Sequence, residues 1–294
     1  MRKVIVIVKH TAFENRSSDP RIMGLVEAGD PAVARMRPAH DDHMETVDEV
    51  LSEIQVLGFN FEVHHGAHST FLPSDDVDAI ITVGGDGTFL AASHLVDRTP
   101  VLGINSAPQH SSGFFCAGRK GLVRATLGAL AEGTIARKAV LRMRVNINGE
   151  PFSDRVLNEA LVCDVCPAAT SRYLITHLTQ DITRYGQPLT EEHRSSGLWV
   201  GTPAGSTGAL ASAGGVIHDL DQRCLQFVVR EPYQPRGTTI ELHRGTFEKE
   251  LTVISKMAEG RIYLDGSHEV LNFTIADRLT FEPSPHPLTI LGIA

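Results

Sequence analysis

The chain has 294 residues, a formal net charge of −8, and 42% hydrophobic and 21% charged residues, which is the ordinary balance of a folded protein with room for two domains. The acidic balance argues against a broad nucleic-acid or membrane-binding surface, because both reward clustered lysine and arginine. No stretch reaches the roughly 20 apolar residues that span a bilayer. The first apolar run is too short for the core of a signal peptide, and no small-residue cleavage site follows it. We therefore expect a cytoplasmic protein without nucleic-acid or membrane partners.

The first 137 residues alternate between strand and helix patterns. The β-branched run at residues 4–8 predicts a strand buried on both faces of a parallel sheet. Residues 11–40 read as a long loop with at most a short helix. An apolar stripe then predicts a helix that ends at Gly58. Further strands are expected at 59–63, 77–83 and 101–104, and further helices up to Leu95 and over 122–131.

This alternation predicts a doubly wound, parallel-sheet α/β domain over residues 1–137, with ligands at the carboxyl ends of its strands. From residue 138 the pattern changes to short strands separated by glycine, proline and asparagine turns, at 141–147, 155–163, 173–179, 224–229 and 251–254. Helical patterns remain only at 208–213 and in part of 185–195. Residues 138–294 are therefore expected to form a β-rich domain, and the extreme C-terminus is a candidate to pack back on the first domain.

The segment Gly84-Gly85-Asp86-Gly87-Thr88 lies between a predicted strand and a predicted helix. Glycines let the backbone approach a ligand closely, and the N–H groups at a helix start attract phosphate oxygens. An acidic residue in such a turn needs a reason: binding a metal, accepting a hydroxyl proton or hydrogen-bonding a ribose. The simpler interpretation makes Asp86 the N-cap of the helix. The segment matches neither the Walker A loop nor the G-x-G-x-x-G pattern of dinucleotide-binding dehydrogenases.

The 84–88 segment resembles the GGDGT motif of NAD kinases, diacylglycerol and sphingosine kinases, and 6-phosphofructokinases. Three later segments resemble NAD kinases in particular. Asn158-Glu159 resembles the family's acceptor-binding Asn-Glu pair, and residues 201–215 (GTPAGSTGALASAGG) resemble its TPTGSTAYxxSxGG segment. Asp265-Gly266 matches a late Asp-Gly turn. The motifs follow the family's order from residue 84 to residue 266, so the resemblance covers nearly the whole chain.

Two positions depart from the common bacterial pattern. Ser196 stands in a Ser-Ser-Gly-Leu stretch where many bacterial members have Asp-Gly, and Ala209 stands where a tyrosine is usual. The first of these, and the Asn-Ser-x-Pro stretch from Asn105, resemble the branch that contains the mitochondrial NAD kinases of animals. The departures leave the nicotinamide-side contacts and the preference between NAD and NADH open.

The resemblance implies phosphoryl transfer from ATP to the 2′-hydroxyl of the adenosine ribose of NAD, which gives NADP. Asp86 is the expected catalytic residue, because it would face that hydroxyl. The residues expected to bind the substrates are Gly85, Gly87, Thr88, Phe89, Asn158, Glu159, Ser196, Ser206, Thr207, Gly208, Ala209 and Ser212. Mg²⁺ is expected to accompany ATP, although the sequence does not name its protein ligands. By resemblance we also expect a symmetric homo-oligomer, a dimer or a tetramer.

Three alternative functions stay open at this point. A catalytically weak NAD(P)-binding sensor is compatible with Ser196 and Ala209. A lipid kinase of the diacylglycerol kinase type shares the 84–88 motif, but there an Asn-Glu pair usually follows at once, whereas here it comes about 70 residues later. A phosphofructokinase-like sugar kinase would not explain residues 158–159 and 202–215. ATP and polyphosphate both remain possible donors.

Cysteine and histidine patterns offer a weaker hint of a metal site. Cys163 and Cys166 form a C-x-x-C, but no second pair accompanies them, so thiols buried in a strand and at its end are the better interpretation. The histidine groups at 40/43 and 64/65/68 lie in polar segments without a companion carboxylate pattern. We interpret them as solvated loop histidines.

Overall fold

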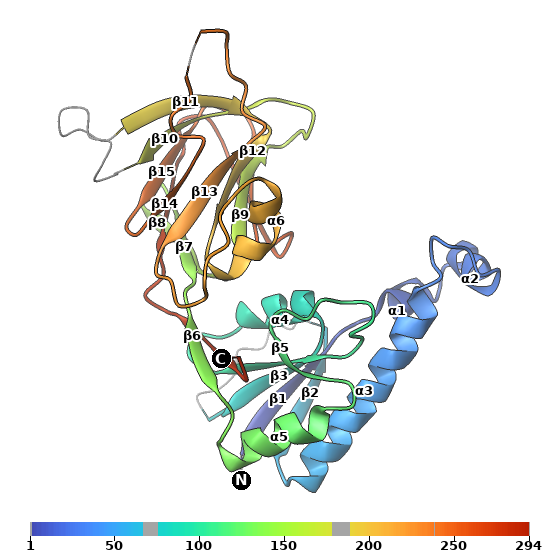
Figure 1. Ribbon diagram of the computed structural model, residues 1–294. Coiled ribbons are helices and arrows are strands. Elements are labelled where there is room, and N and C mark those ends of the chain that lie inside the picture. The colour runs from blue at the N-terminus through green and yellow to red at the C-terminus, as the bar shows by residue number, and fades with distance from the viewer. Residues whose placement is uncertain (1, 67–75, 178–188, 238, 294) are drawn as a thin grey trace. The chain divides into compact units, whose positions relative to one another are not determined.

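Buried β-branched strands alternating with helices build a parallel sheet in the first part of the chain (Figure 1). The structure is a computed structural model that describes residues 2–66, 76–177, 189–237 and 239–293. Its contacts divide the chain into two units, residues 1–139 with 288–294 and residues 140–287. The chain therefore returns to the first unit at its C-terminus.

The sheet of the first unit has seven strands in the order β2-β1-β3-β4-β19-β6, with β5 also paired to β4. Strand β1 pairs in parallel with β2 and β3, and β4 pairs in parallel with β3, β5 and β19. The strands are β1 (Lys3–Val8), β2 (Asn60–His65), β3 (Ala79–Gly84), β4 (Val101–Asn105), β5 (Cys116–Arg119), β6 (Arg137–Val140) and β19 (Leu288–Leu291). The expected doubly wound α/β architecture is confirmed in this unit.

The helices of this unit are α1 (Ala12–Arg16), α2 (Pro20–Glu27), α3 (Met36–Val56), α4 (Asp86–Ser93) and α5 (Val123–Glu132). Helices α3 and α5 bury apolar side chains such as Val50 and Leu127 against Val4, Val6 and other residues on one face of the sheet. The other face carries fully buried Ile7 and Ile80. Helix α4 begins directly after β3 and lies away from α3 and α5 in Figure 1.

The prediction of a long loop over residues 11–40 was wrong. Thr11 and Glu14 form a capping box that starts α1, and the Asp19 side chain caps α2, which has Pro20 in its first turn. Helix α3 begins at Met36, well before the apolar stripe. None of the residues of α1 or α2 is buried, and at 5 and 8 residues both helices are shorter than the window of roughly 11 to 18 residues over which apolar periodicity predicts a helix.

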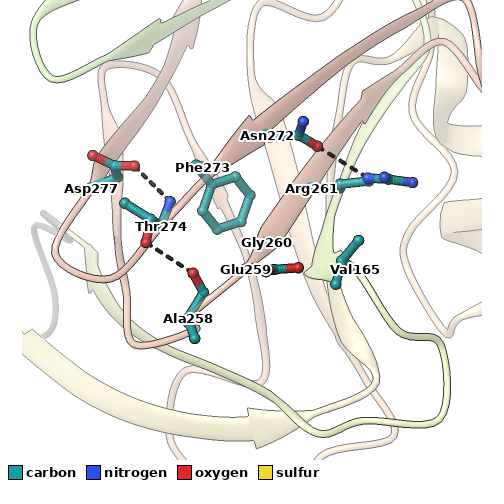
Figure 2. Close-up of a pocket in the computed structure, with 9 residues that line it drawn as sticks. All are labelled: Val165, Ala258, Glu259, Gly260, Arg261, Asn272, Phe273, Thr274 and Asp277. Atoms are coloured by element: carbon teal, nitrogen blue, oxygen red, sulfur yellow. Dashed lines mark hydrogen bonds between the residues drawn. The ribbon is translucent and has the colours of Figure 1, made fainter.

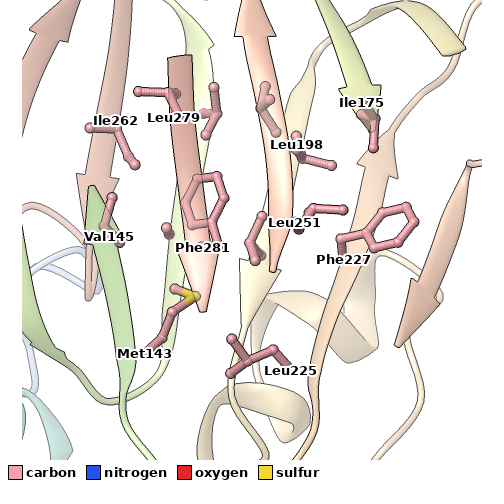
Figure 3. Close-up of a cluster of buried hydrophobic side chains, with 14 of the residues drawn as sticks. Met143, Val145, Ile175, Leu198, Leu225, Phe227, Leu251, Ile262, Leu279 and Phe281 are labelled. Atoms are coloured by element: carbon pink, nitrogen blue, oxygen red, sulfur yellow. The ribbon is translucent and has the colours of Figure 1, made fainter. Parts of the chain in front are cut away.

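The second unit packs two six-stranded antiparallel sheets around one apolar core (Figure 3). The first sheet has the order β11-β10-β15-β18-β7-β8 and the second β14-β13-β12-β9-β16-β17. In Figure 3, Met143 and Phe281 of the first sheet and Leu198 and Phe227 of the second point into the space between the sheets. The β-rich architecture expected for this part of the chain is confirmed.

The strands of the first sheet are β7 (Met143–Ile147), β8 (Glu150–Val156), β10 (Ser171–His177), β11 (Leu189–Ser195), β15 (Leu251–Ser255) and β18 (Arg278–Pro283). Those of the second are β9 (Glu159–Asp164), β12 (Gly197–Gly201), β13 (Leu225–Arg230), β14 (Arg244–Phe247), β16 (Gly260–Leu264) and β17 (Glu269–Phe273). The 3₁₀-helix η1 (Ala204–Thr207) and the helix α6 (Ala209–Ser212) follow β12.

Two strand-region predictions need correction. The helical pattern in 185–195 is the strand β11 where the structure describes it, from Leu189, and it pairs antiparallel with β10. The single strand expected at 155–163 is two strands, β8 and β9, which belong to different sheets.

In the described ranges, no helix combines the length and the apolar character that crossing a membrane requires.

Candidate functional site

The 84–88 turn lies at the carboxyl edge of the parallel sheet, at the end of a strand that has neighbours on both sides. Gly84 is the last residue of β3, and Gly85 is the N-cap of α4. Strand β3 pairs with β1 on one side and with β4 on the other. This edge is where ligands bind in open α/β sheets, so the fold places the turn at a ligand-binding position.

The first two glycines of the turn are required by their neighbours. A Cβ at Gly84 would overlap the Thr88 hydroxyl, and a Cβ at Gly85 would approach the Ser111 hydroxyl to 2.5 Å. Gly87 differs, because a Cβ there would meet nothing within 4 Å and the residue is exposed. Gly84 and Gly85 therefore permit close packing of the turn itself, while Gly87 leaves open space beside the helix start.

Asp86 is the first residue of α4, half-buried, and not the N-cap that the simpler interpretation proposed. Its Oδ1 accepts a hydrogen bond of 2.9 Å from the backbone N–H of Phe115, in the segment that leads into β5. No hydrogen bond to its second carboxylate oxygen occurs within the described residues. One oxygen is thus fixed in place, and the other remains available to a ligand.

A buried group behind the turn holds its backbone. The N–H of Ser106 donates to the carbonyl of Gly84 at 3.0 Å, and the Ser106 hydroxyl is hydrogen-bonded to His43 Nδ1 at 2.8 Å. The interpretation of His43 as a solvated loop histidine was wrong: it lies in α3 and is 1% exposed. Burial, and then the nearby charge of Lys9, lower the pKa of His43 to about 4, so it is neutral at pH 7.

Phe89 does not offer its ring to a ligand, contrary to its predicted binding role. It is 0% exposed and stacks on Phe115, with ring centroids 5.1 Å apart. Phe114, which the sequence analysis did not select, is 45% exposed and packs edge-to-face on Phe115. The exposed aromatic ring nearest in sequence to the Asp86 contact is therefore Phe114. A Gly-Phe-Phe stretch after the predicted strand at 101–104 was the available signal.

In the second unit, the carboxylate of Asp265 holds the residues between β8 and β9. It accepts backbone hydrogen bonds from Leu157 at 2.8 Å, Asn158 at 2.7 Å and Glu159 at 3.1 Å. Asp265 has a positive φ of 48° and is 7% exposed. Three converging N–H donors explain why a negative charge is tolerated there, and they fix the backbone from which both predicted acceptor residues project.

Asn158 and Glu159 carry polar groups that their own unit does not satisfy. The side-chain oxygen of Asn158 is buried without a hydrogen-bond partner among the described residues. Burial, and then the charge of Asp265, raise the pKa of Glu159 to about 7. An unpaired buried acceptor and a strongly perturbed carboxyl are typical of ligand-binding sites rather than of a structural turn.

Residues 202–215 pack against this pair through their backbone. Thr202 donates its N–H to the carbonyl of Asn158 at 2.9 Å, and its hydroxyl bonds to the carbonyl of Leu157. A Cβ at Gly205 would come within 2.8 Å of the Asn158 Cα. Residues 158–159 and the start of the 202–215 segment therefore form one continuous group in this unit.

The other predicted residues of this segment divide by exposure. Ser206 is 0% exposed, and its hydroxyl donates to Pro203 and accepts from the His218 N–H at 3.0 Å, so its role is internal rather than ligand-binding. Thr207, Gly208 and Ser212 are exposed, and Ala209 is half-buried. These four positions remain predicted contacts.

Ser196 lies apart from this group. It precedes β12, whose far end, Gly201, pairs with Glu159. Five strand residues separate the two ends, a distance of about 13 Å between the first and last Cα atoms. The structure does not bring Ser196 next to Asn158 and Glu159 within the unit, so its binding role stays a prediction.

A pocket of about 430 Å³ lies elsewhere in the second unit (Figure 2). Its lining includes Gly260 and Arg261 of β16, Phe273 at the end of β17, and Asp277 after that strand. Strand β16 begins at Gly260 and ends at Leu264, next to Asp265, so the pocket is at the opposite end of this strand from Asp265. None of the predicted binding residues lines it.

The described parts of the chain contain no group of three or more His, Cys, Asp or Glu side chains arranged to hold a metal ion. His68 lies outside the described residues. Cys163 and Cys166 are free thiols, and Cys166 is exposed rather than buried as expected. Neither the C-x-x-C nor the described histidines form a metal site.

Comparisons with known proteins find relatives of this chain in sequence and in fold. A family model described as the ATP-NAD kinase N-terminal domain matches residues 33–130. A protein of Oryza sativa subsp. japonica named "Probable NADH kinase" is 36% identical over 256 residues, 81% of this chain and 77% of that protein. "NADH kinase" of Arabidopsis thaliana is 38% identical over 212 residues, 66% of each chain. An NAD kinase from Archaeoglobus fulgidus, solved in complex with ATP, shares the fold, with a TM-score of 0.61 at 20% identity over 99% of this chain and 93% of that chain.

The raised pKa of Glu159 predicts a pH-dependent stability. Between the ordinary value of 4.5 and about 7, the folded state holds a proton that the unfolded state releases, so stability falls as pH rises through this window. Glu159→Gln removes the ionisation, so the free energy of unfolding of the wild type should fall relative to that of the variant, by at most about 3 kcal/mol between pH 5 and pH 8. Denaturant unfolding followed by the fluorescence of Trp199, the single tryptophan and in the same unit, measures this. Exposed Glu150 supplies the control variant Glu150→Gln, which should follow the wild type. Parallel pH curves for the wild type and Glu159→Gln would contradict the assignment.

Proposed function

The chain belongs to the NAD kinase family, and we propose that Asp86 and the 84–88 turn carry its reaction, the transfer of the γ-phosphoryl group of ATP to the 2′-hydroxyl of the adenosine ribose of NAD. The observation that supports this assignment best is the position of Asp86. Its carboxylate is fixed through one oxygen by the Phe115 N–H, at the start of a helix and at the carboxyl edge of a parallel sheet. The motif departures at Ser196 and Ala209 belong to the second unit and leave the sequence of this turn unchanged.

Phosphoryl transfer requires few catalytic side chains from the protein. Phosphoryl transfer proceeds through a loose transition state, so the protein mainly aligns the reactants and neutralises charge on the phosphate oxygens. The 2′-oxygen forms a bond to the γ-phosphorus while the bond from that phosphorus to the ADP oxygen breaks. The proton of the 2′-hydroxyl passes to the free oxygen of Asp86 and then to solvent. NADP and ADP are the products.

The acceptor nucleotide is assigned to residues 158–159 and 202–215. The unpaired side-chain oxygen of Asn158 suits a donor group of the nucleotide, such as a ribose hydroxyl or an exocyclic amine. Glu159 changes protonation near neutral pH, so it accepts hydrogen bonds when ionised and donates one when neutral. Thr207 and Gly208 are exposed and follow closely after Gly205, which packs on the backbone of Asn158.

Mg²⁺ is proposed to enter with ATP rather than in a protein cage. Mg²⁺ commonly keeps several waters and is bound by one or two carboxylates plus substrate phosphates, which agrees with a turn that offers a single carboxylate. Asp86 is the residue of the 84–88 turn that carries a carboxylate. The ion would supply charge neutralisation at the phosphate oxygens.

The plant relatives are named for action on NADH, so NADH is the second acceptor to test. Polyphosphate is likewise a second candidate donor, because the 84–88 turn contains no group that recognises adenine.

We also propose that the protein is a cytoplasmic homo-oligomer, as the family resemblance suggested. Apolar side chains form a row across the outer face of the second sheet of the sandwich. Strand register places Val270, Tyr263, Leu161 and Trp199 side by side on β17, β16, β9 and β12, and the row ends at the buried Val228 of β13. Tyr263, Leu161 and Trp199 are half-buried and Val270 is 45% exposed. Such a row suits a two-fold contact with a second copy of the chain.

The first functional test is NADP formation by the purified protein with NAD, ATP and Mg²⁺, read through an NADP-specific dehydrogenase. Asp86→Asn should lower kcat by at least about 100-fold and leave the Kd for NAD within about tenfold, because the amide cannot accept the proton. Exposed Asp48 of α3 supplies the control, since Asp48→Asn leaves the turn untouched and should keep full activity.

Equal losses of NAD binding and turnover in Asp86→Asn would instead make Asp86 a positioning residue. NAD binding without product from NAD or NADH, with either ATP or polyphosphate, would favour the sensor alternative over the kinase.

A substitution at Gly87 can test for a ligand beside the helix start without disturbing the packing of the protein. Gly87→Ala adds a methyl group that meets no protein atom within 4 Å, so the variant should fold as well as the wild type or be more stable by about 0.5–1 kcal/mol, since alanine favours helices. The same methyl group should raise the KM for ATP if a phosphate lies against this backbone. Thermal unfolding and ATP kinetics on one preparation test both parts. Unchanged ATP kinetics would place the donor away from Gly87.

Light scattering tests the oligomer. The wild type should have the mass of a dimer or tetramer, and Trp199→Glu should lower that mass, because a carboxylate would have to be desolvated in the contact. Thr190→Glu, on an exposed position of the other sheet, is the control and should keep the wild-type mass. A monomeric wild type would refute the proposal.

A further inference from the structure

We propose that Lys9 binds the phosphate groups of the donor nucleotide, on the β1 side of the 84–88 turn and opposite the side on which Asp86 is held. The inference rests on the proposed kinase activity and adds to it a donor-binding residue. Lys9 belongs to none of the sequence motifs, and it was not among the residues expected to bind a substrate.

Strand register brings Lys9 to the turn. Lys9 follows the last residue of β1, and its N–H donates to the carbonyl of Val83 at 3.1 Å. Val8 pairs with Val83, so Lys9 is the neighbour of Gly84 across the parallel ladder. A Cβ at Gly84 would be 3.2 Å from the Cβ of Lys9 and would overlap the hydroxyl of Thr88. The Lys9 side chain and the Thr88 hydroxyl therefore leave the backbone on the same face, beside the start of α4.

The start of α4 is suited to an anion on this side. Gly85 provides no capping side chain, so the first N–H groups of the eight-residue helix are not capped by a side chain of the N-cap residue. These groups carry partial positive charge and attract phosphate oxygens. A lysine ammonium on a flexible stem next to them adds a full positive charge that follows the phosphate chain.

The charges around the turn favour Lys9 over the other cations at this edge. Lys120 is occupied by Asp42 at 2.7 Å and Glu45 at 2.6 Å. Arg119 pairs in register with Asn105 of β4, and β4 in turn pairs with Gly84. The backbone of Arg119 is therefore two strands, or about 9.5 Å, from β3, whereas Lys9 directly follows the adjacent strand β1.

Lys9 is also free to take a ligand. It is exposed and forms no ion pair with any residue in the described ranges, and its charge acts on His43, which stays neutral at pH 7. In a chain of net charge −8, a triphosphate needs such an uncompensated local cation.

The two sides of the turn also match the geometry of the reaction. Asp86 is tied to Phe115 and Gly85 faces Ser111, and both partners lie in the connection between β4 and β5. Lys9 approaches from β1, on the other side of β3. The attacking and leaving oxygens of a phosphoryl transfer lie roughly in line on opposite sides of the phosphorus. An acceptor at Asp86 and a donor chain along Lys9 satisfy this requirement.

The test compares Lys9→Met, which keeps the aliphatic stem without the charge, with Lys9→Arg and with Lys249→Met, an exposed lysine of the β14–β15 turn. Binding of ATP, AMP and inorganic tripolyphosphate is measured by calorimetry, and NADP formation by kinetics. Lys9→Met should weaken ATP and tripolyphosphate by about 10- to 100-fold, the loss expected for a charge-assisted hydrogen bond. AMP binding and the KM for NAD should stay within about threefold. Lys9→Arg should recover most of the ATP affinity, and Lys249→Met should behave as the wild type.

Unchanged ATP and tripolyphosphate binding in Lys9→Met would overturn the proposal. An equal weakening of AMP, NAD and ATP would do the same, because it would indicate a general disturbance of the fold. Lys9-dependent binding of ATP without NADP formation by the wild type would support Lys9 while the kinase activity fails. NADP formation with a KM for ATP that is unchanged in Lys9→Met would support the kinase activity and overturn the role of Lys9.

Discussion

The end of β3 is too crowded to accept side chains at two successive positions, and the geometry of the first unit's site depends on this constraint. Gly84 is confined by Thr88 and Lys9, and Gly85 by Ser111. Because the glycines bring these neighbours close, a hydroxyl, a cation and a carboxylate surround one short turn of backbone. A side chain at either glycine would push the helix start away from the sheet, and Asp86 would lose its contact with Phe115. The glycines thus act by the space that they leave empty.

The second unit solves a similar problem with a buried charge instead of an absent side chain. Asp265 holds three successive N–H groups and so fixes the backbone of Asn158 and Glu159. The same charge lies close enough to Glu159 to help raise its pKa to about 7, although burial contributes more. Because the charged Asp265 holds the backbone of Glu159, it also makes ionisation of the Glu159 carboxyl less favourable. Such a compromise is expected where a site is selected for binding rather than for stability.

Local sequence predicted the parts of the site that local structure builds. The buried β-branched strands, the 84–88 turn and the architecture of both units follow from periodicity, glycine placement and motif order. Contacts between distant residues could not be predicted: His43 reaches Ser106 across 63 positions, and Asp265 reaches Asn158 across 107. Phe89 was misassigned because adjacency to a motif says nothing of which way a ring points. Helices α1 and α2 were missed because both are too short for apolar periodicity to predict them, and only the capping residues Thr11 and Asp19 mark their starts.

We assign the phosphoryl transfer to the first unit and the recognition of the acceptor to the second, which explains why the 84–88 motif alone does not identify an acceptor. A helix start, a free carboxylate oxygen and a nearby cation suit any phosphate donor and any hydroxyl acceptor, so lipid, sugar and nucleotide kinases can share them. Discrimination must come from groups that read the rest of the acceptor. We assign this discrimination to the unpaired oxygen of Asn158 and the titrating carboxyl of Glu159, whose backbone is held by Asp265 and Thr202 of the same unit. On this assignment, the acceptor can change during evolution through that unit, without rebuilding the turn to which we assign the transfer.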